Sequence, residues 1–544
     1  MKKIFSKILL IALSLLLFVA CSSNGGTKTS DSKILKVAKD TDIISLDTSI
    51  ATDGLSFEII KTFTDGLVEY DANGVIVPLI ALEWSSNEDG TVWTFKLRED
   101  ATWSNGDPVT AHDFVFSWRR AVDPATASEY AVIVIDAGIA NAAKINAGEL
   151  PKEELGVKAL DDYTLEVTLE GAVPYFLQLM NFGTFNPLNE KFVTEQGANY
   201  ATSPETLISN GPFVLTSWNK GNSWTVTKNE NYYDADSIKI DGIEFVLRQD
   251  YATSTLEFDS GSVHVTKISS DLITKYVDGD AFNIFPIGYV WYIAPNHNKP
   301  ELQNANLRLA FAYAIDSEHI VTNIMKDGSL AANYIVPVGL ATGPDGKDFR
   351  DTSSTYLNYD LDLAKEYWEV AKTELGISSI TLSLLIEDSE ESKTNAEQIQ
   401  SDLQQLDGVT ITIETVIKSV RLDRMRAGDY DLGLTRWGPD YADPFTYLGT
   451  LFPTGTNYNY SQYSNADYDA LVAKTAPGGE FATDEMERWL AFKELEAILL
   501  NEAGVIPIWQ SGEAILISPN VTGIEYHVVG TTSYRNVVIA DAGE

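Results

Sequence analysis

Residues 380–386 read ITLSLLI, a short and mostly apolar run that is typical of a buried strand. Segments with helical spacing and with strand character then alternate along the chain, at 393–406, 409–416, 420–427 and 431–436. This order predicts a strand–helix–strand–helix–strand unit, the pattern of an α/β lobe with parallel strands.

A helix is predicted just before this unit, at 360–376. Asp360 or Asp362 can cap its start, and Gly376 ends it. Ligands of open α/β sheets bind beyond the carboxyl ends of the strands. The last strand of the unit ends in RWGPDY at 436–441, so we expect a ligand site there.

The N-terminal half carries a second well-marked stretch. Residues 93–98 alternate as a strand does, and 103–108 form a turn cluster. The sequence TAHD at 110–113 then predicts a capping box that opens a helix with Phe114, Trp118 and Ala121 on one face.

The stretch 82–124, which contains VWTFKLREDATWSNGDPVTAHDFVFSWRRAVDP, resembles the signature segment of the family 5 extracellular solute-binding proteins, the peptide-binding class of ABC importers. Further similar motifs follow in order: DDYTLEV at 161–167, VPYF at 173–176, NGPF at 210–213, NLRLAFAYAID at 306–316 and RWGPDYADP at 436–444. The resemblance runs from Ser32 to Glu544 and is strongest to oligopeptide-binding lipoproteins.

This resemblance implies an α/β, two-lobed, periplasmic-binding-protein-like fold of the cluster C type, with an extra subdomain on lobe I and a hinge between the lobes. Hinge closure would enclose the ligand. The implied layout is a signal peptide at 1–20, a lipidated N-terminus and tether at 21–32, lobe I at 33–65, the extra subdomain at 66–189, lobe I at 190–290, lobe II at 291–506 and lobe I at 507–544.

An oligopeptide ligand is implied as well, delivered to the permease subunits of an ABC importer. A receptor for varied peptides has to use what all peptides share, which is the main chain and the terminal charges. The resemblance places one main-chain-pairing segment at 434–438 and a facing one at Thr52, Asp53 and Gly54. Gly438 and Gly54 lack side chains, which permits close backbone approach.

Asp440 matches the position where oligopeptide-binding proteins hold the α-ammonium of the ligand. A charge-assisted bond shielded from water is strong and fixes the register of the peptide. From the residues alone, an Asp after Gly-Pro is also an ordinary turn former. Asp443, before Pro444, is the better candidate for that turn role.

Five aromatic or basic residues complete the implied site. Trp437 and Tyr130 match family positions that contact ligand, and Trp291 and Tyr292 lie where aromatic residues line the cleft, although aromatic side chains are more often simply core. Arg436 could pair with a peptide carboxylate or with an acid of the opposite lobe, and the sequence leaves both open.

One departure from the family concerns the other end of the peptide. Basic side chains hold the ligand carboxylate in members that close around short peptides, but the matching positions here are Leu434 and Ser392, with Lys393 beside the latter. The sequence therefore predicts an open end that tolerates longer peptides.

The N-terminus predicts export and lipid attachment. Lysines precede an apolar run at 8–20, which at about 20 Å is too short to span a bilayer. LFVAC at 17–21 resembles a lipobox, with Phe18 where Leu is commoner, so we expect Cys21 to carry the lipid. Durable anchoring needs two acyl chains. The expected location is the extracellular face of a membrane of the Gram-positive type.

Composition excludes some partners. The 544 residues hold 39 Lys and Arg against 78 Asp and Glu, a formal net charge of −39, so no nucleic acid is expected to bind. Most of these acids should form a solvated face, and attraction of cationic ligands is the weaker alternative. We expect a monomer.

Catalysis is not expected. The chain has no G-x-S-x-G, H-E-x-x-H or P-loop motif, and its five histidines have no metal-ligand spacing, so neither a metal nor a cofactor is predicted. A hydrolase using two carboxylates remains a rival without a selected pair. Nearer alternatives are a binder of a nickel chelate or other small solute, and a peptide-pheromone receptor.

Overall fold

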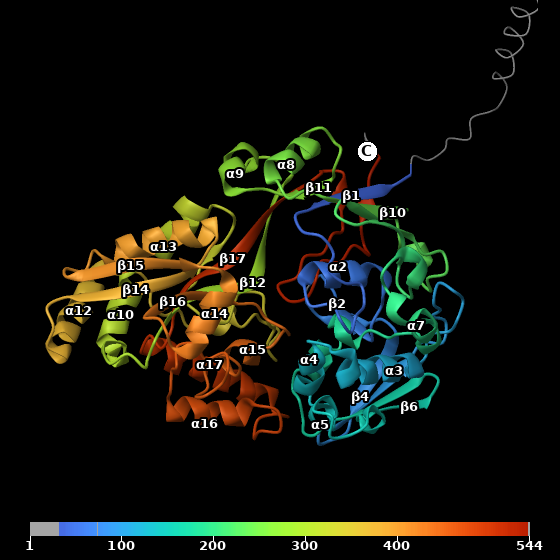
Figure 1. Ribbon diagram of the computed structural model, residues 1–544, viewed down its shortest axis with the longest axis horizontal. Coiled ribbons are helices and arrows are strands. Elements are labelled where there is room, and N and C mark those ends of the chain that lie inside the picture. Colours follow the sequence, from blue (N-terminus) through green and yellow to red (C-terminus); the bar gives the residue numbers. More distant parts are fainter. Residues whose placement is uncertain (1–31, 73, 542–544) are drawn as a thin grey trace, which may run out of the picture. The chain divides into compact units, whose positions relative to one another are not determined.

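The predicted α/β unit is present in the computed structural model, which describes residues 32–72 and 74–541 (Figure 1). Strand β14 (Ile380–Glu387) pairs in parallel with β15 (Val409–Val416) along its length and with β16 (Leu432–Trp437) at two positions. Helices α13 (Glu390–Leu403) and α14 (Lys418–Ala427) connect them. The prediction of strand, helix, strand, helix and strand is therefore confirmed.

The helix before this unit is also confirmed. In α12 (Leu361–Leu375), the Asp360 carboxylate accepts a hydrogen bond from Leu363 N at 3.0 Å, and Gly376 ends the helix with a φ of 66°. The next helix, α13, begins three residues earlier than expected, because Ser389 is its cap and accepts from Ser392 N at 3.1 Å.

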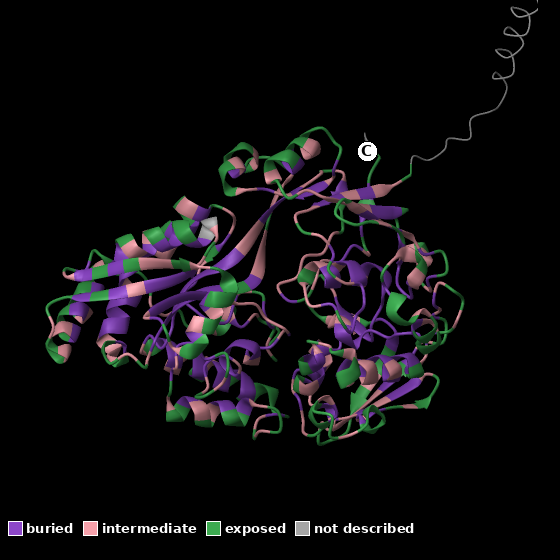
Figure 2. Ribbon diagram, viewed as in Figure 1, coloured by how far each residue is buried: buried purple, intermediate pink, exposed green. Residues whose placement is uncertain are grey.

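Two long strands connect the halves of one mixed sheet. Strands β12 (Phe282–Pro295) and β17 (Ile506–Ile517) pair antiparallel at the centre of the strand order β15-β14-β16-β12-β17-β11-β1-β10-β9-β8, in which β11 is Val265–Lys267. Strand β12 is buried from Val290 to Pro295, whereas from Phe282 to Ile287 it is partly buried, with Ile284 exposed (Figure 2). A break in the pairing register between Pro286 and Val290 marks the change.

Separate hydrophobic cores lie on either side of these strands. Toward β14 and β15, two cores pack helices α10 (Ala305–Ala314), α12, α16 (Ala466–Thr475) and α17 (Glu485–Asn501) against the sheet. On the other side, one core lies under strands β1 (Ile34–Lys39), β8 (Phe213–Asn219), β9 (Ser223–Lys228) and β10 (Gly242–Leu247), together with helix α2 (Gly54–Phe63).

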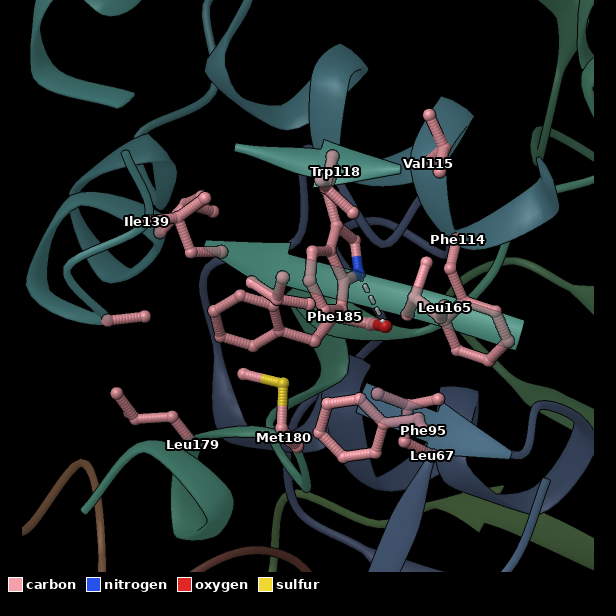
Figure 3. Close-up of a cluster of buried hydrophobic side chains, with 14 of the residues drawn as sticks. Leu67, Phe95, Phe114, Val115, Trp118, Ile139, Leu165, Leu179, Met180 and Phe185 are labelled. Carbon is pink, nitrogen blue, oxygen red and sulfur yellow. Dashed lines mark hydrogen bonds between the residues drawn. The ribbon is translucent and has the colours of Figure 1, made fainter. Parts of the chain in front are cut away.

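A further core belongs to the antiparallel sheet in the order β4-β5-β7-β6. Its strands are β4 (Ala81–Ser86), β5 (Val92–Leu97), β6 (Val157–Asp161) and β7 (Thr164–Thr168). Helix α3 (Ala111–Val122) buries Phe114, Trp118 and Ala121 against it, and the Trp118 indole donates to the Phe185 carbonyl at 2.9 Å (Figure 3). The predicted capping box is present, with Thr110 N donating to Asp113 at 2.8 Å.

Candidate functional site

A cavity of about 270 Å³ collects residues from distant parts of the chain. Its wall includes the segment around the start of α2, Tyr130, the 438–440 loop after β16, and the C-terminal segment at 528–535. Five of the predicted site residues line it: Asp53, Gly54, Tyr130, Gly438 and Asp440.

The Asp440 side chain is the most distinctive feature of this cavity. Within residues 32–72 and 74–541, its carboxylate has no ion-pair partner and no hydrogen-bond donor; only its backbone N donates, to Thr446 Oγ1 at 3.3 Å. Burial, with a smaller effect from the Asp136 carboxylate, raises the pKa of Asp440 to about 6. Burial also raises the pKa of Asp136 to about 6. The free protein thus holds a half-buried acid that a cation would stabilise.

Asp53 faces the cavity from the start of α2. One of its carboxylate oxygens accepts from Ser56 N at 2.9 Å and so caps the helix, while the other is buried without a hydrogen-bond partner among the described residues. The space where a Cβ of Gly54 would lie is open. A ligand main chain can therefore approach this segment closely, and Asp53 offers it one acceptor.

Tyr130 also lines the cavity. Its ring contacts Phe57 edge-on at 5.7 Å and Phe182 at 5.1 Å. Burial, with a smaller effect from Asp440, raises the pKa of Tyr130 to about 12. The hydroxyl therefore stays protonated at neutral pH and remains a hydrogen-bond donor near Asp440.

Gly438 leaves room for a neighbouring aromatic side chain. A Cβ at this position would lie 2.4 Å from the ring of Tyr289, which itself lines the cavity. The missing side chain of Gly438 thus makes room for Tyr289, a wall residue that sequence reasoning missed. Tyr289 lies within the register break between Pro286 and Val290 in β12, a feature that depends on pairing with β17 and has no local sequence signal.

Arg436 and Trp437 lie beside the cavity and are not among its wall residues. The Arg436 guanidinium lies over the rings of Tyr289 at 5.0 Å and Trp291 at 4.8 Å. The Trp437 indole donates to Thr446 Oγ1 at 3.4 Å. Among the described residues, Arg436 forms no ion pair with an acidic side chain, and its guanidinium contacts aromatic faces instead.

Trp291 and Tyr292 belong to the protein core. Trp291 is 1% exposed and stacks on Trp509 at 5.0 Å, and Tyr292 is 2% exposed and packs edge-on against Phe452. Neither lines the cavity. The physical reason is that β12 is buried on both faces here, so both of these successive side chains point into a core.

Sequence reasoning also missed a charged cluster at the floor of the cavity, formed by Lys61, Asp65, Glu69 and Arg535. Arg535 pairs with Asp65 at 2.7 Å and with Glu69 at 3.2 Å. Burial lowers the pKa of Lys61, whose Nζ is buried without a hydrogen-bond partner among the described residues. The four-residue spacing of Lys61, Asp65 and Glu69 suggests a helix face, but α2 ends at Phe63 and Arg535 comes from the far end of the chain.

Two positions of this chain match those where family members that close around short peptides carry basic side chains, and neither is basic here. Leu434 and Ser392 are fully buried. Lys393 pairs with Asp388, and Arg421 pairs with Glu387 at 3.3 Å while also donating to the Leu434 carbonyl at 3.3 Å. Lys393 and Arg421 are therefore each already paired with an acidic side chain.

Cys21 lies outside the described residues. In the part of the chain that the structure does describe, no helix has the length and hydrophobicity needed to cross a membrane.

Comparison with known proteins identifies the fold and the family. Residues 75–459 match the bacterial extracellular solute-binding proteins, family 5, middle part. The chain belongs to this family. The dipeptide-binding protein of Lactococcus lactis subsp. cremoris is 33% identical over 97% of both chains. Both comparisons are with proteins that bind solutes.

Solved structures agree. Listeria monocytogenes OppA bound to peptide is 35% identical, with a TM-score of 0.74 over 94% of this chain and 100% of that one. The pheromone receptor PrgZ is 30% identical, also with a TM-score of 0.74 over 94% of this chain and 100% of that one. The resemblance to the family and the two-lobed α/β fold predicted from sequence are thus confirmed.

Proposed function

We propose that this protein captures oligopeptides outside the cell and delivers them to an ABC importer, with the peptide α-ammonium on Asp440. The observation that carries the proposal is the Asp440 carboxylate, which is half-buried, faces the cavity and lacks a partner among the described residues. An ammonium enclosed there forms a strong charge-assisted bond. Relatives named for dipeptide and oligopeptide binding support a peptide as the ligand.

The main chain of the peptide would pair with β16. Strand β14 pairs with β16 only at Leu432 and Gly433, so in the described part of the chain the following residues have no strand neighbour on that edge. An extended peptide can add there as a strand, with its other edge toward Asp53 and Gly54. Such pairing reads no side chain, which suits a receptor for varied sequences.

Closure would occur about β12 and β17. The cavity is lined by Gly54 and Asp53 from one side and by Gly438 and Asp440 from the other, and the two strands join these sides. Tyr441 of the proposed lobe II stacks on Tyr175 of the proposed subdomain, with the ring centres 4.0 Å apart. We place lobe I at 33–65, 190–290 and 507–544, its subdomain at 66–189, and lobe II at 291–506.

Attachment would be through a lipid on Cys21 at the outer face of the membrane, after removal of residues 1–20. The protein would act as a monomer. Metabolic labelling with a radioactive fatty acid, in cells expressing the native chain or Cys21→Ser, tests the anchor. Label and membrane association should both be lost in Cys21→Ser.

The test of ligand capture is calorimetric titration of the mature protein with a tripeptide that has a free amine. Asp440→Ala should weaken binding by roughly 2–5 kcal/mol, because the ammonium loses its enclosed partner. Asp423→Ala removes the same charge at an exposed site and should leave affinity unchanged. Equal affinity in Asp440→Ala and the native protein would contradict the anchor.

A pheromone receptor is the second candidate, because PrgZ shares 30% identity and the fold. Capture would use the same cavity, and only the source of the peptide would differ. Mass spectrometry of ligand retained through mild purification separates the two: a mixture of peptides indicates nutrient uptake, whereas one defined peptide indicates signalling. A retained metal chelate would instead favour a small-solute binder.

A further inference from the structure

A second cavity of about 580 Å³ continues from the first. Four residues line both: Tyr70, Gln178, Val528 and Val529. We call this second cavity the rear chamber. The two spaces are therefore neighbours.

The rear chamber differs sharply from the first cavity in charge. The first cavity holds Asp, Glu, Lys and Arg side chains. By contrast, none of the described residues that line the rear chamber is acidic or carries a Lys or Arg, although these four types make up 22% of the sequence. Its wall is mainly apolar and includes Ile76, Trp84, Leu177 and Leu340. Burial lowers the pKa of His527, also in the wall, to about 4, so that ring is neutral at pH 7.

The junction of the two cavities suits the amino end of a peptide. Gln178 Oε1 is buried there and has no hydrogen-bond partner among the described residues, so it can accept from an N–H group. Asp440 lines the first cavity, and Ala442, two residues later, lines the rear chamber. Two residues span at most about 7 Å. The side chain nearest to an ammonium on Asp440 is that of the first peptide residue.

Together these observations suggest what occupies the chamber. We infer that the rear chamber receives the first side chain of the bound peptide and selects a large apolar one, with Gln178 assisting Asp440 in holding the amino end. This inference rests on the proposed function. It gives the receptor a preference for the side chain of the first peptide residue, whereas pairing with the peptide main chain does not depend on sequence. Burial of an apolar side chain against an uncharged apolar wall is favourable, whereas burial of an unpaired charge there is unfavourable.

Calorimetric titration of the mature protein with Phe-Gly-Gly and Ala-Gly-Gly tests the inference. Phe-Gly-Gly should bind about ten- to a hundredfold more tightly, since a phenyl ring leaves water. Leu177→Gln and Ile76→Gln, which make the chamber polar from two separate elements, should each reduce this ratio roughly fivefold. Leu256→Gln is the matched control, because Leu256 is 68% exposed in α8 (Tyr251–Asp259), outside both cavities.

The outcomes separate the two claims. Equal binding of the two peptides by the native protein overturns the rear chamber assignment while the peptide-binding function stands. The same holds if Leu177→Gln and Ile76→Gln, still folded by thermal melting, keep the native ratio. Absence of binding to either peptide overturns the proposed function itself.

Discussion

Asp440 and Asp443 lie three residues apart in the sequence but in opposite environments. Asp443 forms a two-pronged ion pair with Arg488, at 2.5 and 2.9 Å, and also accepts from Phe445 N at 2.8 Å. It thus takes the turn role expected for it. Asp440 has no such partner among the described residues, and burial raises its pKa. The same loop thus contains one carboxylate that stabilises the fold and a second that is available to bind a ligand.

The largest effect on stability is expected at Asp443. Asp443→Ala leaves Arg488, which is 5% exposed, as a buried charge without its partner. Breaking such a pair costs about 3–5 kcal/mol. Urea unfolding should show this loss. If Asp443→Ala lowers the free energy of unfolding by less than about 1 kcal/mol, Asp443 does not have the structural role that distinguishes it from Asp440.

A smaller effect concerns pH. Because the pKa of Asp440 is about 6 in the free protein, its carboxylate is mostly ionised at pH 7 and mostly protonated at pH 5. Affinity for a peptide with a free amine should therefore fall about tenfold between these values, as titration at each pH would measure. Asp440→Asn should remove most of this dependence. An affinity of the native protein that rises from pH 7 to pH 5 would contradict this prediction.

The smallest effect is on the stability of the ligand-free protein. The folded pKa of Asp440 lies above the value of 3.8 for an unperturbed Asp, so the folded protein binds this proton more tightly than the unfolded chain does. The stabilisation that protonated Asp440 gives the folded state is therefore present below pH 4 and is lost as the pH rises through 6. Asp440→Asn should then stabilise the empty protein by about 1 kcal/mol at pH 7, reduced for partial exposure. Thermal melting at pH 4 should show no such gain.

Local signals in the sequence predicted much of this structure. The capping box at Thr110 and the caps of α12 act within a few residues, so the sequence alone locates them. Asp440 and Gly54 were identified through resemblance, and the structure places both on one cavity wall. Gly54 and Asp440 are far apart in the chain, so spacing alone would not have joined them.

What could not be predicted depends on distant contacts. The core positions of Trp291 and Tyr292 follow from β12 being covered on both faces, which no local pattern reveals. The floor of the cavity needs Arg535 beside Asp65, residues separated by 470 positions. Charged clusters of this kind depend on the closed fold and not on the spacing of their members.

Titration of the mature native protein with one peptide in two forms, with a free amine and with that amine acetylated, tests whether Asp440 holds the amino end. Acetylation removes the positive charge and leaves the rest of the peptide unchanged. If Asp440 holds the amino end, the acetylated form should bind at least about tenfold more weakly at pH 7, and Asp440→Ala should abolish the difference. Equal affinity of the two forms for the native protein would contradict the role of Asp440 as the anchor.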